Sequence, residues 1–167
     1  MHRRFERYLK RLLLAILKLL IGSRRHPDLV SNPFKRILVI RQHDQLGDML
    51  CVVPLLRSLR QRYPDAFIAL MTSPVSHEVM LRNCYVDRTI NYDKREFLGG
   101  ASVKLGRFLK FIRELRREKF ELAIVPSTVS MSATSDMFGY LSGAKYRIGA
   151  GEINGVENPS GLFFNSP

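Results

Sequence analysis

The sequence contains only two cysteines, Cys51 and Cys84, among its 167 residues. Two cysteines exclude a dense disulfide framework, and no Cys-x-x-Cys pair or Cys/His cluster has the spacing of zinc ligands. We therefore expect a protein of the reducing cytoplasm that has no metal site. Cys51 is expected to be a small buried side chain within a helix, and Cys84 a thiol in a loop.

Long apolar runs and nucleotide-binding motifs are also missing. No uninterrupted apolar run is longer than that of residues 12–17, which is far shorter than the roughly 20 residues that cross a bilayer. Neither a Gly-x-Gly-x-x-Gly fingerprint nor a Gly-x-x-x-x-Gly-Lys-[Ser/Thr] loop is present, so nucleotide binding has no support in these residues. Apolar residues nevertheless make up 46% of the chain, which is enough to form a core and excludes a disordered protein.

Acidic residues are few, and the resulting positive charge is unevenly distributed. The chain has 27 lysines and arginines against 15 acidic residues, a formal net charge of +12. Most of this excess lies in residues 1–36, where basic residues alternate with leucine and isoleucine. This alternation favours an anionic membrane surface as the partner over nucleic acid.

Residues 1–22 are predicted to form a basic amphipathic helix. Their basic residues recur at intervals of three, four and seven, so that most of them share one side of a helix. The residues expected to contact lipid headgroups are Arg4, Arg7, Lys10, Arg11 and Lys18. Two alternatives remain open: a helix packed on its own domain or on a partner, and a signal or anchor segment.

Residues 23–34 are predicted to be a linker, and residues 35–150 an α/β domain. Aliphatic runs predict strands over residues 37–40, 67–71, 88–92, 122–125 and 146–149. Helical patterns cover residues 47–63, 75–81, 104–119 and 133–141, and Pro54 suggests a break in the first of these. The alternation predicts a Rossmann-like parallel sheet with helices on both faces, preceded by the amphipathic helix. Residues 151–167 follow as the expected start of an interdomain segment.

The loop over residues 41–48 is the strongest candidate site. It follows the first predicted strand, and ligands bind outside the carboxyl ends of strands in open α/β sheets. Gly47 would permit a tight turn and a close approach of the backbone to a ligand. Asp48 would place a carboxylate at the start of the next helix, although an aspartate at that position is commonly only a helix N-cap.

Other polar residues follow predicted strands. His43, Asp44 and Gln45 belong to the same loop, and Ser127 and Thr128 come after the fourth strand. The hydroxyls of Ser127 and Thr128 could hydrogen-bond a polyhydroxylated ligand, and His43 could be a base that the neighbouring Asp44 orients. Each also has an ordinary alternative, as a solvated loop pair or a turn hydroxyl.

Several segments in order resemble glycosyltransferase family 9, the ADP-heptose:lipopolysaccharide heptosyltransferases. Near the start, the resemblance rests on residues 35–41, the triplet Leu46-Gly47-Asp48, residues 54–60 and residues 63–65. Further along, residues 120–125 and 141–149 are similar to later stretches of the family, so the resemblance covers roughly residues 35–149. The loop between Arg41 and Leu46 is one residue longer than the common family pattern.

The resemblance implies the N-terminal, acceptor-binding half of a GT-B enzyme, which has two Rossmann-like domains facing a cleft. The family transfers heptose from ADP-heptose to the Kdo or heptose of the lipopolysaccharide inner core, with inversion and without a metal. Its Gly-Asp pair corresponds to Gly47 and Asp48, and the aspartate would be the general base. The residues expected near the acceptor are Gly47, His43, Asp44, Gln45, Ser127 and Thr128. The donor would bind a C-terminal domain that is expected to be absent from residues 1–167, so this polypeptide is expected to be inactive alone.

Three functions remain under consideration. The first is this acceptor-binding half, held by residues 1–22 on anionic lipids at the cytoplasmic face of the inner membrane. The second is a non-catalytic α/β module that binds an anionic glycolipid or phosphosugar at the membrane surface. A nucleic-acid-binding domain is third, because only the net charge suggests it.

Overall fold

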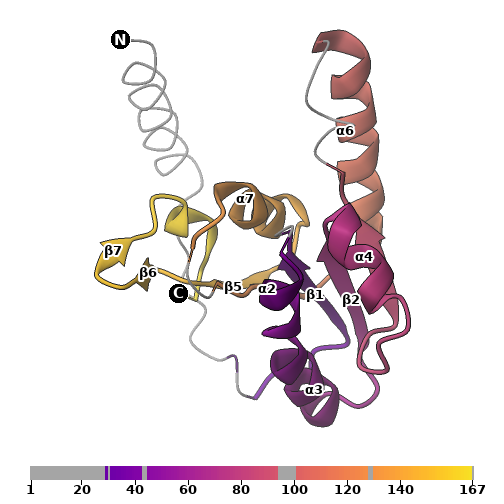
Figure 1. Cartoon of the computed structure of the whole chain (residues 1–167), viewed down its shortest axis with the longest axis vertical. Helices are drawn as coiled ribbons and strands as arrows, with labels where there is room; N and C mark the ends of the chain where they lie inside the picture. Colours follow the sequence, from indigo (N-terminus) through magenta and orange to yellow (C-terminus); the bar gives the residue numbers. More distant parts are fainter. Residues whose placement is uncertain (1–28, 30, 43–44, 94–100, 128–129, 167) are drawn as a thin grey trace.

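A five-stranded parallel sheet forms the centre of the protein (Figure 1). The structure is a computed structural model that describes residues 29, 31–42, 45–93, 101–127 and 130–166. The strands have the order β3-β2-β1-β4-β5. Their bounds are Arg36–Arg41 (β1), Phe67–Thr72 (β2), Arg88–Asn91 (β3), Leu122–Val125 (β4) and Tyr146–Gly149 (β5). All five predicted strands are therefore confirmed, and β1 occupies the centre of the sheet.

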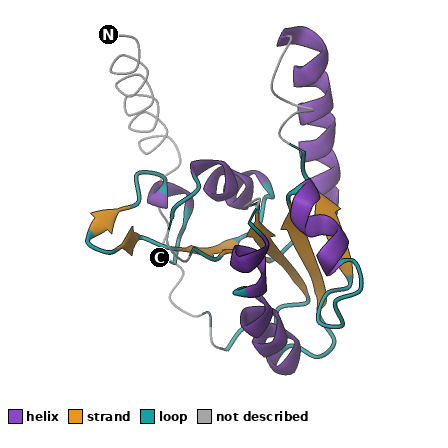
Figure 2. Ribbon diagram, viewed as in Figure 1, coloured by secondary structure: helices purple, strands orange, loops and turns teal. Residues whose placement is uncertain are grey.

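Helices connect the strands and cover both faces of the sheet, as Figure 2 shows. They are α2 (Leu46–Leu50), α3 (Val53–Arg62), α4 (Pro74–Met80), α6 (Ala101–Arg117) and α7 (Ala133–Leu141). Among the described residues, no helix is long and apolar enough to span a bilayer. The predicted helix of residues 1–22, with its five candidate lipid-binding residues, lies outside the described part of the chain.

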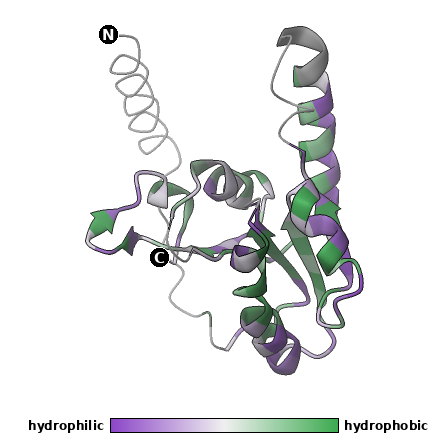
Figure 3. Ribbon diagram, viewed as in Figure 1, coloured by the Kyte–Doolittle hydropathy of each residue, from purple (hydrophilic) through white to green (hydrophobic). Residues whose placement is uncertain are grey.

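Alternate residues of each central strand enter two separate cores. Ile37 and Val39 of β1 pack with residues of α2, α3 and α4 on one face. Leu38 and Ile40 pack with α6 and α7 on the other. Successive side chains of a strand point to opposite faces, so a strand covered on both sides is apolar throughout. In Figure 3 the central strands β1 and β2 are largely hydrophobic, whereas the helices carry both hydrophobic and hydrophilic residues.

The first predicted helix is divided into α2 and α3 at Cys51 and Val52. Val52 is the residue before α3, and Pro54 occupies the first turn, where its missing amide proton costs nothing. The predicted break near Pro54 is thus confirmed. The prediction that Cys51 is buried is wrong, because this break turns Cys51 outward and directs Val52 into the core.

Residues after β5 form a small hairpin and then return to the domain. β6 (Glu152–Ile153) pairs antiparallel with β7 (Val156–Glu157). Asn154 and Gly155 connect them with φ angles of 52° and 77°, as the Asn-Gly pair of a type I′ turn requires. The 3-10 helix η1 (Gly161–Phe163) follows, and Phe164 then enters the core on the α6 and α7 face. The expected interdomain segment therefore packs on the α/β domain.

Candidate functional site

Arg41 is a fully buried cation at the carboxyl end of the central strand. Its side chain is 1% exposed. Nη1 donates a hydrogen bond of 2.9 Å to the carbonyl of Pro126, which directly follows β4. Nη2 lies 3.2 Å from Oδ2 of Asp48 in α2. A buried charge is stable only with such partners, so Arg41 fixes Asp48 relative to the ends of β1 and β4.

Asp48 lies in the first turn of α2, with its side chain 17% exposed. The residue that caps this helix is Gln45, and it makes no side-chain capping bond. The carboxylate of Asp48 pairs with Arg41 and is not the N-cap of α2. Because the side chain is partly exposed, the carboxylate remains accessible to a ligand.

Gly47 lies in a helix, so the prediction that it forms a tight turn is wrong. It lies within α2, and a Cβ at this position would meet no atom within 4 Å. No positive φ angle requires a glycine here. The exposed surface beside Asp48 is therefore open, which leaves room for a molecule to approach the carboxylate.

Gln42 adds a second buried polar group at this edge. The side chain is 2% exposed, and Nε2 lies 3.1 Å from the sulfur of Met71 in β2. Its Oε1 has no hydrogen-bond partner among the described residues. A buried amide oxygen without a partner carries a desolvation cost, so a ligand hydroxyl at this point would be stabilising.

The structure places the remaining predicted site residues with less detail. Gln45 is exposed at the start of α2, and Ser127 is half-buried two residues after β4. Both are at the carboxyl edge, as predicted. His43, Asp44 and Thr128 lie outside the described residues. The described residues contain no group of three or more histidine, cysteine or acidic side chains that could hold a metal ion.

A buried polar cluster around Asp136 lies further along the carboxyl edge of the sheet, at the first turn of α7. Asp136 is 1% exposed, and its Oδ2 lies 2.5 Å from the hydroxyl of Ser160 and 3.0 Å from Nδ2 of Asn158. Burial raises the pKa of Asp136, while hydrogen bonds from Ser160 and Asn158 to its ionised form act in the opposite direction. The cluster joins α7 to the segment after β5.

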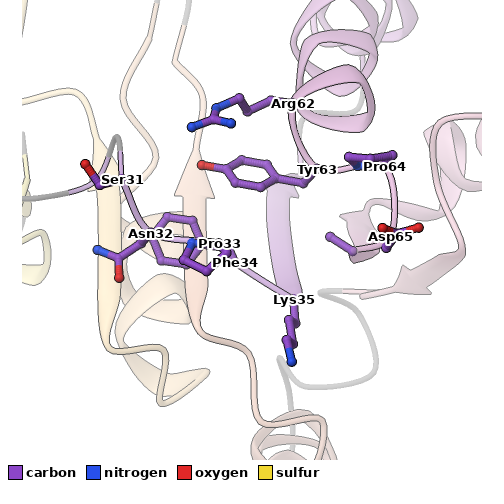
Figure 4. Close-up of a pocket in the computed structure, with 10 residues that line it drawn as sticks. Ser31, Asn32, Pro33, Phe34, Lys35, Arg62, Tyr63, Pro64 and Asp65 are labelled. Carbon is purple, nitrogen blue, oxygen red and sulfur yellow. The ribbon is translucent and has the colours of Figure 1, made fainter.

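Two cavities lie at the opposite, amino-terminal edge of the sheet. One has a volume of about 380 Å³ and lies between Asn32–Lys35 and Arg62–Ala66 (Figure 4). Arg62 and Tyr63 extend toward Ser31 in this view, whereas Lys35 points away. The second, about 740 Å³, shares Phe34 and is lined by Arg116, Lys119 and Lys145. We place the candidate site at the carboxyl edge instead, because the Arg41–Asp48 ion pair, with its partly exposed carboxylate, is there.

The role of Arg41 was not predicted, because this residue was expected to belong to the polar loop over residues 41–48. The available signal was its position immediately after four aliphatic residues of a strand predicted to be buried. An arginine there must be buried, and a buried arginine needs an acidic partner. Gln42 and Asp136 gave no comparable signal, because their burial depends on segments distant in sequence.

No protein-family model matches this sequence, and the search of curated proteins gave no significant match. Solved structures do match. The chain is similar to E. coli ADP-heptose lipopolysaccharide heptosyltransferase II, with 26% identity and a TM-score of 0.53 over 68% of this chain and 30% of that one. It is also similar to E. coli heptosyltransferase WaaC with ADP-2-deoxy-2-fluoro heptose, with 16% identity and a TM-score of 0.62 over 78% and 41% of the two chains.

A third match is the glycosyl transferase family 9 structure from Veillonella parvula, with 19% identity and a TM-score of 0.58. It covers 78% of this chain and 39% of the other. The chain thus spans 30 to 41% of the length of these three structures. It has the Rossmann-like fold of one half of a GT-B heptosyltransferase. Two of the three structures above are heptosyltransferases, and the third is a glycosyl transferase of family 9.

Proposed function

We propose that this chain is the acceptor-binding half of a glycosyltransferase that transfers heptose from ADP-heptose to a lipid-linked inner-core acceptor. The observation that carries the proposal is the Arg41–Asp48 pair, at the edge of the sheet where open α/β folds bind ligands. The similarity to heptosyltransferase II supports the same assignment. The donor would bind a second domain, and transfer would invert the anomeric centre without a metal.

Asp48 is the general base of this proposed reaction. An acceptor hydroxyl attacks the anomeric carbon from the side opposite the ADP leaving group and must lose its proton as the new bond forms. The partly exposed carboxylate of Asp48 takes that proton. The contribution of a positioned base of this kind is typically a factor of about 10² to 10⁴ in rate.

Arg41 is a positioning residue for that base. Its guanidinium is held on the opposite side by the carbonyl of Pro126, so it has little freedom to move with Asp48. A carboxylate constrained by a buried partner keeps one orientation as substrate arrives, which lowers the entropy lost on reaching the transition state. The short loop residues His43, Asp44 and Gln45, with Ser127 and Thr128, complete the proposed acceptor site beside Gly47.

The proposed acceptor is carried on a membrane, so the protein would act at the cytoplasmic face of the inner membrane. The basic helix of residues 1–22 would hold it there through Arg4, Arg7, Lys10, Arg11 and Lys18, since each basic residue near an anionic surface contributes about 1 kcal/mol. A non-catalytic module that binds an anionic glycolipid or phosphosugar at the same site is the alternative.

Acceptor binding tests the proposal directly. The ¹⁵N-labelled chain is titrated with Kdo-bearing lipid A in detergent micelles, and lipid A without Kdo serves as the control. We expect saturable shifts of the Gly47 and Asp48 amides with the Kdo-bearing lipid only. Shifts confined to the cavities beside Phe34, or equal shifts with both lipids, would contradict an acceptor site at Asp48.

A further inference from the structure

The cluster of Asp136, Asn158 and Ser160 contains more hydrogen-bond contacts than an ionised aspartate can satisfy. The hydroxyl oxygen of Ser160 lies 2.5 Å from Oδ2 of Asp136 and 2.9 Å from Oδ1 of Asn158. Both distances are those of hydrogen bonds between oxygens. A serine hydroxyl has one proton, so it donates to only one of these two oxygens.

The orientation of the Asn158 amide is fixed by its other neighbours. Its Oδ1 accepts a hydrogen bond of 3.0 Å from the backbone amide of Ser160. Its Nδ2 donates to the carbonyl of Ala150 at 2.8 Å and to Oδ2 of Asp136 at 3.0 Å. In the exchanged orientation, the amide nitrogen would face the backbone N–H of Ser160, and the amide oxygen would face the carbonyl of Ala150. Asn158 therefore has no proton to give Ser160, and the missing proton must come from Asp136.

We propose that Asp136 is a neutral carboxylic acid in the folded protein, protonated at Oδ2. This proton completes the set of hydrogen bonds that joins α7 to the segment after β5. Asp136 then donates to Ser160, Ser160 donates to Oδ1 of Asn158, and Asn158 donates back to Asp136. Every contact in the cluster becomes a hydrogen bond. The remaining oxygen, Oδ1 of Asp136, is buried without a partner, which costs far less for a neutral acid than for a carboxylate.

The surroundings of Asp136 favour the neutral acid. The side chains bonded to it, Asn158 and Ser160, carry no charge, and burial raises its pKa. On the adjacent strand β5, the guanidinium of Arg147 binds the carbonyls of Phe163 and Ala144 at 2.7 and 2.8 Å. The acidic residues of the hairpin, Glu152 and Glu157, are exposed.

Ionisation of Asp136 weakens the hydrogen bonds at only one end of the segment after β5. Ser160 then donates to the carboxylate, and its oxygen faces Oδ1 of Asn158 without a proton between them. The far end of the segment is held separately, because the side chain of Asn165 bonds the backbone of Arg147 and Lys145 at 2.8 and 2.7 Å. Raising the pH should therefore loosen residues 150–160 while residues 163–165 stay in place.

The carboxyl ¹³C resonance of Asp136 in the full chain measures its protonation directly. We expect Asp136 to keep the chemical shift of a neutral acid at a pH where an aspartate in an unstructured reference peptide has fully ionised. Titration of Asp136 together with the aspartate of the reference peptide would overturn the proposal.

Ser160→Ala separates the two possible directions of the Asp136–Ser160 hydrogen bond. If Ser160 accepts from the neutral acid, its removal lowers the pKa of Asp136; if Ser160 only donates to a carboxylate, removal raises it. Ser76→Ala, which removes another buried hydroxyl, is the control and should leave the titration unchanged. A raised midpoint in Ser160→Ala would overturn the proposal.

Stability as a function of pH provides a measurement that does not depend on Ser160→Ala folding. A folded-state pKa above the unfolded value makes unfolding easier as pH rises between the two values. We expect the urea midpoint of the wild type to fall over that window relative to Asp136→Asn, whose side chain has no titrating proton. Parallel curves for the two proteins would contradict a neutral Asp136.

Discussion

The guanidinium of Arg41 and the carboxylate of Asp48 lie 3.2 Å apart, although one belongs to the central strand and the other to the following helix. The carbonyl of Pro126 holds the other side of the guanidinium. This contact joins the ends of β1 and β4 to α2.

Arg41→Met is expected to destabilise the folded protein by about 3 kcal/mol, because removing one partner of a buried ion pair leaves the other without compensation. Urea denaturation of the variant and the wild type measures the change. Arg57→Met, an exposed arginine on α3, is the matched control and should stay within about 0.5 kcal/mol. Equal effects of the two substitutions would show that Arg41 has no special role.

Asp48→Asn is expected to lower heptose transfer by about a hundredfold or more in a protein that combines this chain with a donor domain. The amide keeps the shape of the side chain but accepts a proton poorly. Acceptor affinity should change much less than kcat, and Asp65→Asn, an exposed aspartate, should change neither. Turnover of Asp48→Asn close to that of wild type would rule out the base role and favour the non-catalytic binding module.

Gly149→Ala is expected to destabilise the protein by about 1 to 3 kcal/mol, as overpacking a full core does. A Cβ at this position would overlap the buried ring of Phe164 at Cζ. Gly106→Ala is the opposite case, since nothing lies within 4 Å of its Cβ and it is inside α6. Alanine there should stabilise the helix by roughly 0.5 to 1 kcal/mol. Thermal or urea unfolding that gave the same sign for both would refute the close packing of Phe164 on β5.

Flotation with vesicles tests the predicted lipid-binding helix of residues 1–22. We expect the full chain to float with vesicles rich in anionic phospholipid and not with neutral ones, and high salt should weaken the interaction. Replacing Arg4, Arg7 and Arg11 by glutamate should abolish flotation, whereas the same change at Arg57, Arg113 and Arg117 should not. Negligible binding of the wild type to both kinds of vesicle would contradict attachment through this segment.

The order and type of the main elements could be predicted because each is encoded locally. Four aliphatic residues at 37–40 read as a strand buried on both faces, and the amphipathic spacing over 104–119 reads as a helix; the structure contains β1 and α6 there. Pro54 correctly indicated the break that separates α2 from α3. The exposed position of Cys51 was not predicted, since the direction of a side chain at a helix break depends on the packing of its neighbours.

Other features depend on parts of the chain that are distant in sequence. The sequence by itself determined an α/β alternation, the placement of Gly47 and Asp48 after the first strand, and a basic N-terminal segment. Only the tertiary structure decided that Arg41 is the partner of Asp48 and that Asp136 meets Ser160, 24 residues away. Local sequence patterns predict which side chains of a segment are buried and which are exposed. The partner of a buried charge depends instead on which segments the order of strands in the sheet brings together.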